Sequence, residues 1–466
     1  MERNCIVGAL ILAAGKGVRM RSDRPKAMQK ILGEPLLYYG LTAVHSLHAG
    51  PTAVVVGHKG SLISEYLGKS FPGSAIVWQH EQLGTGHALQ IAREWWLSFS
   101  HVLVLPGDVP LITPDSLSRL IDHHCAMKAA CSFISFSASN PSGYGRVLRS
   151  DDGCRIIEEK DATEDQKRVT EVNSGVYVFS VPALDSVIDF LSNENAQGEY
   201  YLPDILTLLA KNGHRVEAVR SDSETEFLGV NSSRQLAEAA SCKRSEIIDG
   251  WTDAGARFQA PETVFVGPGV TLASDVELSP FVQIYGSSTI GSGTTIGSFS
   301  VVRDSVISEG CSILDHVVLE SCSIATGAKI GPFAYLRDGA QVARDAYVGK
   351  FVEVKKSTIG ERSKVPHLSY IGDAEIGEDT NIGAGTITCN YDGIRKNPTK
   401  IGNRCFVGSD TMFVAPVELG DDAFTGAGSV ITQDVPEGDL AVARAKQRNI
   451  PGWGKKKNSR KNEGGN

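Results

Sequence analysis

The sequence lacks several features that would point to a membrane, to disulfide bonds or to nucleic acid. No apolar run is long enough to span a bilayer, and no charged segment followed by a long apolar stretch opens the chain. Its nine cysteines are scattered, with no C-x-x-C pair and no metal-ligand spacing, which suits reduced thiols. The net charge is -8, and the one basic run, 455–461, lies in a tail that we expect to be disordered. We therefore expect a cytoplasmic protein with neither membrane nor nucleic-acid partners.

What the sequence has instead is a six-residue repeat over much of its second half. A period of six fits neither a helix, with period 3.6, nor a half-buried strand, with period 2, and it is typical of a β-solenoid with one inward aliphatic residue per flat side. Small residues often follow, as in Ile290-Gly291, and should allow tight turns, some at positive φ. The handedness stays open, although the general rule for parallel crossovers favours a right-handed coil. The repeat includes Val264, Val270, Val276, Val282, Ile290, Ile296, Val302, Ile324, Ile330, Leu336, Val342, Val348, Ile401 and Val407.

One interruption breaks the repeat. Between Ile382 and Ile401 lies the segment TITCNYDGIRKNPTK, which is too polar and too long for one flat side. An insertion in a solenoid emerges as a loop on one face, often the binding face. A tolerated surface insertion is the other interpretation.

The first half alternates between apolar runs and helical patterns. Five runs read as strands, at 5–12, 53–56, 76–78, 102–105 and 131–136, and three segments read as helices, at 35–47, 62–67 and 86–96. This alternation predicts an α/β domain with a largely parallel sheet, whose ligands bind at the carboxyl ends of the strands. A helix at 233–248 should lead to the solenoid. At 466 residues we expect these parts: a domain at 1–232, a linker helix at 233–250, the solenoid at 251–453 and the tail at 454–466.

Two polar segments follow predicted strands in the first half. The stretch LAAGKGVRM, from Leu12, lets backbone N–H groups approach phosphate oxygens, and Lys16, Arg19 and Lys26 add positive charge. It matches neither a Walker A motif nor a Rossmann G-x-G-x-x-G, and alone it fits a simple turn equally well. After the fourth strand comes Asp108, whose carboxylate suits Mg²⁺, although an isolated Asp there is as often structural.

The solenoid also carries charged residues that a passive scaffold would not need. Arg337 and Lys355 lie about one coil apart and could clamp a phosphate. His367 follows within one further turn, and an ordinary histidine pKa of about 6.5 suits a general base near neutrality. A lone histidine in a repeat is more often a surface residue.

With these motifs in view, the first half resembles nucleotide-sugar pyrophosphorylases. The match rests on LAAGKGVRM followed by RPKA, on QHEQLGTGH after the third strand, and on the order of the later segments. Pro106 departs from the family, whose members often carry a substrate-contacting tyrosine there. The resemblance implies that Lys26 and Arg19 serve catalysis and that Asp108 and Asn231 hold Mg²⁺. It assigns the triphosphate to Leu12, Ala13, Ala14, Gly15 and Lys26, the uracil to Gln79, Gly84 and Thr85, and the rest of the UDP-sugar to Gly145, Glu158, Asn173 and Asn231.

The second half resembles hexapeptide glucosamine-1-phosphate acetyltransferases, which coil left-handed and associate as homotrimers. The resemblance implies that His367 takes a proton from the substrate amine as the amine attacks acetyl-CoA. It assigns the sugar phosphate to Arg337, Lys355, Tyr370 and Asn381. It assigns acetyl-CoA to Ala384, Asn390, Tyr391, Ser409, Ala427 and Arg444.

Over residues 6–453 the chain resembles the bacterial bifunctional enzymes that join both activities. The fold this implies is an α/β Rossmann-like nucleotidyltransferase domain followed by a left-handed parallel β-helix of hexapeptide repeats. The reactions implied are acetylation of glucosamine 1-phosphate by acetyl-CoA, then Mg²⁺-dependent uridylyl transfer from UTP to N-acetylglucosamine 1-phosphate. Two alternatives remain: a monofunctional nucleotidyltransferase with a structural solenoid, and a non-catalytic scaffold related to pyrophosphorylase-like subunits.

Overall fold

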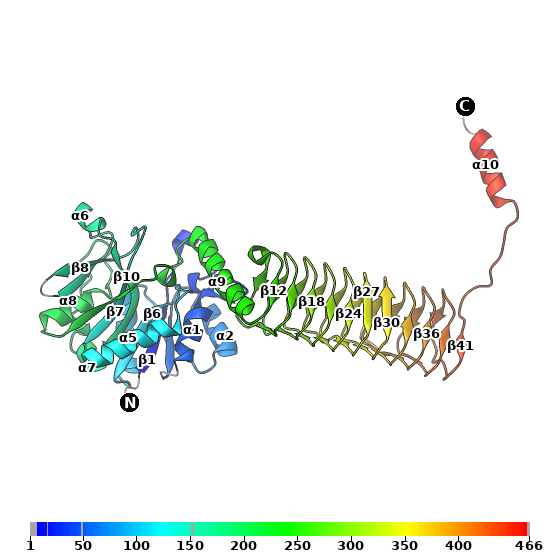
Figure 1. The fold of residues 1–466 in the computed structure, drawn as a ribbon, viewed down its shortest axis with the longest axis horizontal. Helices are drawn as coiled ribbons and strands as arrows, with labels where there is room; N and C mark the ends of the chain where they lie inside the picture. Colours follow the sequence, from blue (N-terminus) through cyan, green and yellow to red (C-terminus); the bar gives the residue numbers. More distant parts are fainter. Residues whose placement is uncertain (1–6, 16, 48–49, 151–152, 464–466) are drawn as a thin grey trace. The chain divides into compact units, whose positions relative to one another are not determined.

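One long helix, α9 (Ser233–Asp253), contains the boundary between two structural units of the chain (Figure 1). The computed structural model describes residues 7–15, 17–47, 50–150 and 153–463. The units are Met1–Glu246 and Ile247–Asn466. Ala239 of α9 is buried in a core of the first unit, whereas Ile248 is buried in the core of the second. The helix thus supplies apolar residues to both units and continues five residues beyond its predicted end at 248.

A mixed β-sheet forms the centre of the first unit, with strand order β11-β7-β10-β6-β1-β4-β5. The five predicted strands are confirmed, although residues 5 and 6 of the first lie outside the described part. Parallel pairing joins β6, β1, β4 and β5, as predicted, whereas β10 runs antiparallel to β6 and β7. The strands are β1 (Val7–Ala13), β4 (Thr52–Val56), β5 (Ala75–Trp78), β6 (His101–Pro106), β7 (Cys131–Ser137), β10 (Glu171–Ser180) and β11 (Val216–Ser221).

Helices pack on both faces of this sheet because its strands are apolar on both sides. In β1, Ile11 belongs to one buried cluster and Leu10 to the other. The first cluster includes side chains from α1 (Leu36–Ser46), α2 (Gly60–Ser70) and α5 (Pro114–Met127). The second includes side chains from α3 (Thr85–Ile91), α4 (Arg93–Trp96), α7 (Val181–Asp185) and α8 (Asp204–Lys211).

The prediction of a single helix at 86–96 was wrong, because the structure has two helices, α3 and α4, separated at Ala92. The Trp96 indole N–H donates a hydrogen bond to the Leu89 carbonyl at 2.9 Å. In a continuous helix that carbonyl would accept from the backbone N–H four residues on. The indole is fully buried, so its donor needs this partner.

A small hairpin branches from the sheet at β10, next to the predicted sugar-binding residues Gly145 and Glu158. Its strands are β8 (Arg146–Ser150) and β9 (Gly153–Ile157), and β8 also pairs with β10 through Arg146 and Val172. The short helix α6 (Glu164–Lys167) follows, with Thr163 and Gln166 forming a capping box. A separate two-strand ribbon consists of β2 (Lys30–Ile31) and β3 (Glu34–Pro35).

The predicted solenoid is confirmed in the second unit (Figure 1), and its strands form three parallel sheets. Each coil contributes one short strand to each sheet, and pairing partners lie 17 or 18 residues apart over most of its length, as in Thr271 with Thr289 and Thr289 with Val306. The six-residue aliphatic positions are confirmed as the core, because every one named above is buried. The first strand of the solenoid is β12 (Arg257–Phe258) and the last is β41 (Leu440–Ala441).

The glycines that follow the aliphatic positions have a different role from the one expected. Gly291 does not have a positive φ; a Cβ there would lie 2.5 Å from the backbone nitrogen of Glu309 on the next coil. Gly383 is equally close to Ser409. These glycines therefore allow successive coils to stack closely, while the left-handed corner positions are often occupied by larger residues such as Asp275 and Phe281.

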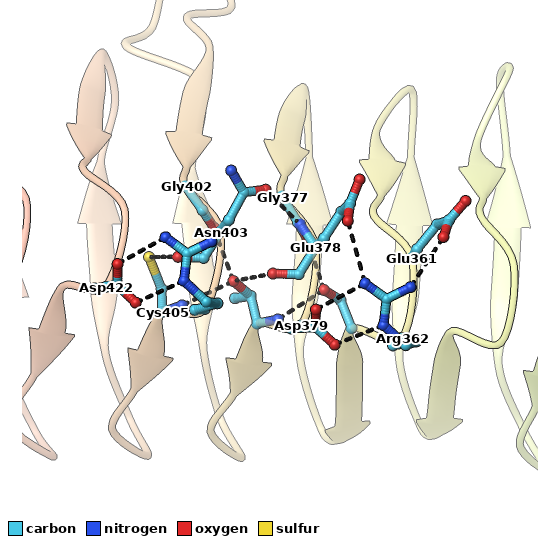
Figure 2. Close-up of polar contacts among 12 residues, drawn as sticks. Glu361, Arg362, Gly377, Glu378, Asp379, Gly402, Asn403, Cys405 and Asp422 are labelled. Carbon is cyan, nitrogen blue, oxygen red and sulfur yellow. Dashed lines mark hydrogen bonds and ion pairs between the residues drawn. The ribbon is translucent and has the colours of Figure 1, made fainter.

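One corner of the solenoid carries a ladder of ion pairs between coils (Figure 2). The Arg362 guanidinium donates to both carboxylate oxygens of Asp379 at 2.8 Å, and Arg404 does the same to Asp422 at 2.8 and 2.7 Å. All four residues have φ between 54° and 58°. The pairs are exposed to solvent, so each adds little stability, but they neutralise charges that would otherwise repel along the corner.

The C-terminal tail differs from the disordered segment expected at 454–466. Helix α10 (Trp453–Glu463) occupies most of it. Lysine and arginine have good helix propensity, which accounts for a helix with no apolar stripe to bury. None of the helices in the described ranges is long and apolar enough to cross a membrane.

Candidate active sites

The candidate nucleotide site lies where strands β1 and β6 end side by side. Leu12 pairs with Pro106, and the Gly107 N–H donates to the Leu12 carbonyl at 2.9 Å. The chain runs from β1 to one side of the sheet and returns to β6 on the other, which is where α/β sheets bind ligands. The loop of Leu12, Ala13, Ala14 and Gly15 therefore starts next to Asp108.

Four predicted polar side chains meet at this edge. Lys26 Nζ forms an ion pair with the Asp108 carboxylate and donates to Asn231 Oδ1 at 2.6 Å. Arg19 Nη2 donates to the same Asn231 oxygen at 3.1 Å. The Val230 N–H donates to the Asp108 carbonyl at 3.0 Å, which brings Asn231, far along the chain, beside Asp108.

This cluster fits a magnesium ion. The Lys26 ammonium contacts oxygens of both Asp108 and Asn231, so those oxygens converge on a position that already accepts a cation. Among the described residues, no three His, Cys, Asp or Glu side chains form a metal cluster. One carboxylate and one amide oxygen nevertheless suit Mg²⁺, which usually keeps water and substrate phosphates as its other ligands.

Gly17 is a residue of this loop that motif reading did not single out. Its φ is 60°, and a Cβ there would lie 2.8 Å from the Cβ of Lys26. A side chain at position 17 would thus be strained and would displace Lys26. The glycine in LAAGKG was the available signal. Lys16, the other cation expected here, lies outside the described residues.

The predicted base-binding residues pack against a distant segment. Gln79 is buried, and its side-chain amide donates to the Gly84 carbonyl at 3.0 Å and lies 3.1 Å from His87 Nδ1. Thr85 Oγ1 accepts from the Leu202 N–H at 3.2 Å. The Gly86 N–H donates to the Tyr200 carbonyl at 2.8 Å, so the segment around Tyr200 and Leu202 supports this loop through its backbone.

The predicted sugar residues are also brought together. The Asn173 N–H donates to the Gly145 carbonyl at 2.9 Å, and Asn173 lies in strand β10 rather than in a loop. Glu158 follows β9, and a Cβ on Gly145 would lie 3.4 Å from its Oε1. Burial, followed by the nearby carboxylates of Asp204 and Asp161, raises the pKa of Glu158 to about 7.

On the solenoid, the two cations predicted to bind phosphate are neighbours. Arg337 in β25 (Tyr335–Arg337) pairs with Lys355 in β28 (Glu353–Lys355) on the adjacent coil. Arg337 Nε and Nη2 donate to Glu353 Oε1 at 2.9 and 2.8 Å. The ammonium of Lys396 lowers the pKa of Lys355, and burial adds to the effect. Lys396, which sequence reasoning missed, thus joins the cations from the inserted loop.

The predicted base and its neighbours lie around one corner of the next coil. His367 ends β30 (Lys364–His367) and Tyr370 begins β31 (Tyr370–Gly372). The Asn390 side-chain amide donates to Asp373 Oδ2 at 2.6 Å and to the Tyr370 hydroxyl at 3.4 Å. Gly372 leaves room for the tyrosine, because a Cβ there would collide with its phenol.

The predicted coenzyme residues form a column along the same corner. Ile382, Val407 and Thr425 are paired neighbours in β33 (Asn381–Ile382), β36 (Phe406–Val407) and β39 (Phe424–Thr425). Two residues after each of these come Ala384, Ser409 and Ala427.

Three further predicted residues lie near this column or on the inserted loop. Arg444 Nη1 donates to the Ala427 carbonyl at 2.9 Å, which ties the start of the tail to the column. Asn381 lies in β33 opposite Lys364 of the preceding coil. Tyr391 is exposed on the loop at 390–398, which leaves the solenoid between β34 (Ile387–Cys389) and β35 (Thr399–Ile401).

Comparison with known proteins gives matches to both units. Residues 9–165 match the MobA-like NTP transferase domain, and residues 398–433 match the bacterial transferase hexapeptide model of six repeats. A solved UDP-glucose pyrophosphorylase complexed with UDP-glucose covers 52% of this chain and 99% of its own, at 16% identity and a TM-score of 0.44.

Curated relatives match almost the whole chain. The bifunctional protein GlmU of Heliobacterium modesticaldum is 45% identical over 94% of this chain and 96% of its own length. The bifunctional protein GlmU of Thermus thermophilus is 44% identical over 96% and 98%. These relatives thus match both the nucleotidyltransferase sheet and the left-handed β-helix of hexapeptide repeats, in the same order and over nearly the whole chain. The chain belongs to the family of bifunctional GlmU proteins.

Proposed function

We propose that the two units catalyse consecutive steps toward UDP-N-acetylglucosamine, a precursor for cell-envelope synthesis. The solenoid transfers the acetyl group of acetyl-CoA to glucosamine 1-phosphate, and the N-terminal unit transfers UMP from UTP to the resulting N-acetylglucosamine 1-phosphate. The observation that carries this proposal is the presence of two separate polar clusters, one near the ends of β1 and β6 and one on the solenoid. The chain that holds them matches a bifunctional relative over 94% of its length. A cytoplasmic location would give both units access to UTP and acetyl-CoA.

In the acetyl step, the sugar phosphate binds to the cations Arg337, Lys355 and Lys396. The substrate amine attacks the thioester carbonyl carbon, His367 takes a proton from that nitrogen, and the C–S bond breaks to release the coenzyme thiol. The hydrogen bonds from Asn390 to Tyr370 and Asp373 hold the inserted loop beside this corner. Orientation of the amine and thioester supplies much of the rate enhancement.

In the uridylyl step, a phosphate oxygen of the sugar attacks the α-phosphorus of UTP, and the bond to the pyrophosphate oxygen breaks. Lys26 and Arg19 stabilise the charge on the phosphoryl oxygens, and the loop from Leu12 to Gly15 donates backbone N–H groups to the triphosphate. Asp108 and Asn231 would hold Mg²⁺, which neutralises phosphoryl charge when bound. Gly145, Glu158 and Asn173 bind the sugar.

We further propose that the active assembly is a homotrimer. The column of Ala384, Ser409 and Ala427 follows an outer corner of the solenoid, so one chain would cover a bound coenzyme on one side only. A neighbouring copy would complete the site. Family resemblance supplies the number three.

The first test is thiol release from acetyl-CoA by the purified protein, with and without glucosamine 1-phosphate. We expect release that depends on the sugar and is lost in His367→Ala, while pyrophosphate release from UTP continues in that variant. A folded protein that makes UDP-N-acetylglucosamine but releases no thiol would instead be a monofunctional nucleotidyltransferase with a structural solenoid. Failure of both reactions would favour the scaffold.

A further inference from the structure

A fully buried arginine lies behind the proposed sugar pocket, outside the set of residues assigned to either reaction. Arg146 opens strand β8 and is 1% exposed. A guanidinium is expensive to bury unless its N–H groups are paired. Its partners therefore show what this side chain holds in place.

The Arg146 guanidinium joins three separate parts of the chain. Nη2 forms an ion pair with Glu159 Oε2 at 2.6 Å. Nε donates to the Lys167 carbonyl at 3.3 Å, and Nη1 donates to the Tyr144 carbonyl. Glu159 Oε2 also accepts from the Gly143 N–H at 3.1 Å. Gly143 and Tyr144 of the turn 143–145 are thus tied to one ion pair, in which the arginine is buried and the Glu159 side chain is 33% exposed.

This turn and the carboxylate that follows β9 supply two of the residues proposed to bind the sugar, Gly145 and Glu158. Gly145 has no room for a side chain, because a Cβ there would lie 2.8 Å from Ile156 Cγ2. Its carbonyl accepts from the Asn173 N–H, and Glu158 lies beside it. Because Glu158 and Glu159 are adjacent, an ion pair that anchors Glu159 also sets the distance between Glu158 and Gly145.

We propose that Arg146 is a positioning residue for the sugar phosphate, which holds Gly145, Glu158 and Asn173 in register without touching the substrate. This inference rests on the proposed uridylyl transfer. The partners of the Arg146 guanidinium are Glu159, Lys167 and Tyr144 of the turn 143–145, and none of them belongs to the triphosphate loop from Leu12 to Gly15. Arg146 therefore positions the sugar-binding residues and not the nucleotide-binding loop.

The test compares Arg146→Gln and Arg146→Lys in the full-length protein. We expect Arg146→Gln to raise KM for N-acetylglucosamine 1-phosphate about tenfold or more while KM for UTP stays within about twofold. Arg146→Lys should recover part of the affinity, because an ammonium can still pair with Glu159 but cannot reach all three partners. Arg149→Gln is the matched control: this arginine is also on β8 but is 51% exposed and pairs with Glu171.

Two further measurements, of acetyl transfer and of UDP-N-acetylglucosamine binding, distinguish a positioning role of Arg146 from a general loss of structure. Acetyl transfer by the solenoid should be unchanged, and UDP-N-acetylglucosamine binding by calorimetry should weaken as KM rises. If Arg146→Gln unfolds the N-terminal unit, Glu159→Gln removes the same pair with Arg146 present and should raise the same KM. Equal loss for both substrates, or an unchanged sugar KM in folded variants, overturns the inference. An inactive wild-type protein would instead overturn the proposed function.

Discussion

At the scale of single residues, Lys26 stands where the nucleotide site would hold its metal ion. Its ammonium contacts both Asp108 and Asn231, and the Arg19 guanidinium donates to Asn231 as well. Positive side chains thus satisfy the two oxygens in this structure. Phosphate groups would draw these cations away and leave the oxygens to Mg²⁺.

We therefore expect Lys26→Met to bind a divalent cation more tightly in the absence of nucleotide, by about tenfold, because a competing ammonium has gone. Titration with Mn²⁺, followed by electron paramagnetic resonance of the free ion, measures this directly. Lys59→Met, which changes an exposed lysine paired with Asp23, should bind Mn²⁺ as the wild type does. Equal affinities in all three proteins would contradict competition at this position.

A second expectation at this scale concerns the pKa of Glu158, which burial and nearby carboxylates raise to about 7. Below pH 7 the carboxyl is mostly protonated, and above it the carboxylate is a stronger acceptor for sugar hydroxyls. Affinity for N-acetylglucosamine 1-phosphate should thus improve as the pH rises through 7. Glu158→Gln should lose that dependence and keep any dependence due to the phosphate itself. Parallel pH profiles of KM would rule out Glu158 as the titrating group.

At the scale of elements, the solenoid depends on how closely its coils approach. Glycines such as Gly291 and Gly383 lie against the backbone of the next coil, whereas left-handed corner positions carry Asp, Phe and Arg as well as Gly. The six-residue repeat therefore has two different constraints: an aliphatic core position and a neighbour without a side chain. Only the second explains the Ile-Gly pairs.

Gly291→Ala should consequently destabilise the second unit by about 1–3 kcal/mol, because its Cβ would force two coils apart. Gly293→Asp is the control: its φ is 68°, nothing lies within 4 Å of a Cβ there, and Asp275 has a φ of 65° eighteen residues earlier. Its effect should be about 0.5 kcal/mol or less. Denaturant unfolding followed by circular dichroism gives both values, and equal losses would show that the turn conformation is the dominant constraint.

At the scale of the whole molecule, each unit has its own buried core and its own candidate site. The first set of proposed catalytic groups lies near the ends of β1 and β6, and the second lies on coils of the solenoid. We therefore expect a substitution in one unit to leave the core and the polar contacts of the other unchanged.

Asp108→Ala should therefore abolish uridylyl transfer and leave acetyl transfer within about twofold of wild type, and His367→Ala should do the reverse. Separate assays of pyrophosphate and thiol release measure the two activities. Sedimentation should show each variant with the oligomeric state of the wild type. Loss of both activities in a folded variant would argue against independent sites.

Much of this arrangement can be predicted from the amino-acid sequence. The spacing of the aliphatic residues can be measured in the sequence, and it indicates which positions face inward. The six-residue period therefore predicted both the solenoid and the residues of its core. Glycine-rich and polar segments after apolar runs likewise predicted the Leu12 loop and Asp108. The break at Ala92 could not be predicted from the sequence, because it depends on a hydrogen bond from the Trp96 indole N–H to the Leu89 carbonyl. The helical tail also differed from expectation.

The sequence by itself determined the order of the two units, the inward residues of each coil and the types of side chain available for chemistry. Tertiary structure alone decided which of these side chains are in contact: Lys26 with Asn231, Lys396 with Lys355, and Arg146 with Glu159. Each pair joins residues that are distant in the sequence or that belong to different elements, and their proximity follows from strand order, coil stacking and burial. The periodicity of a sequence indicates whether a residue is buried, whereas the residues that it contacts are determined by the whole fold.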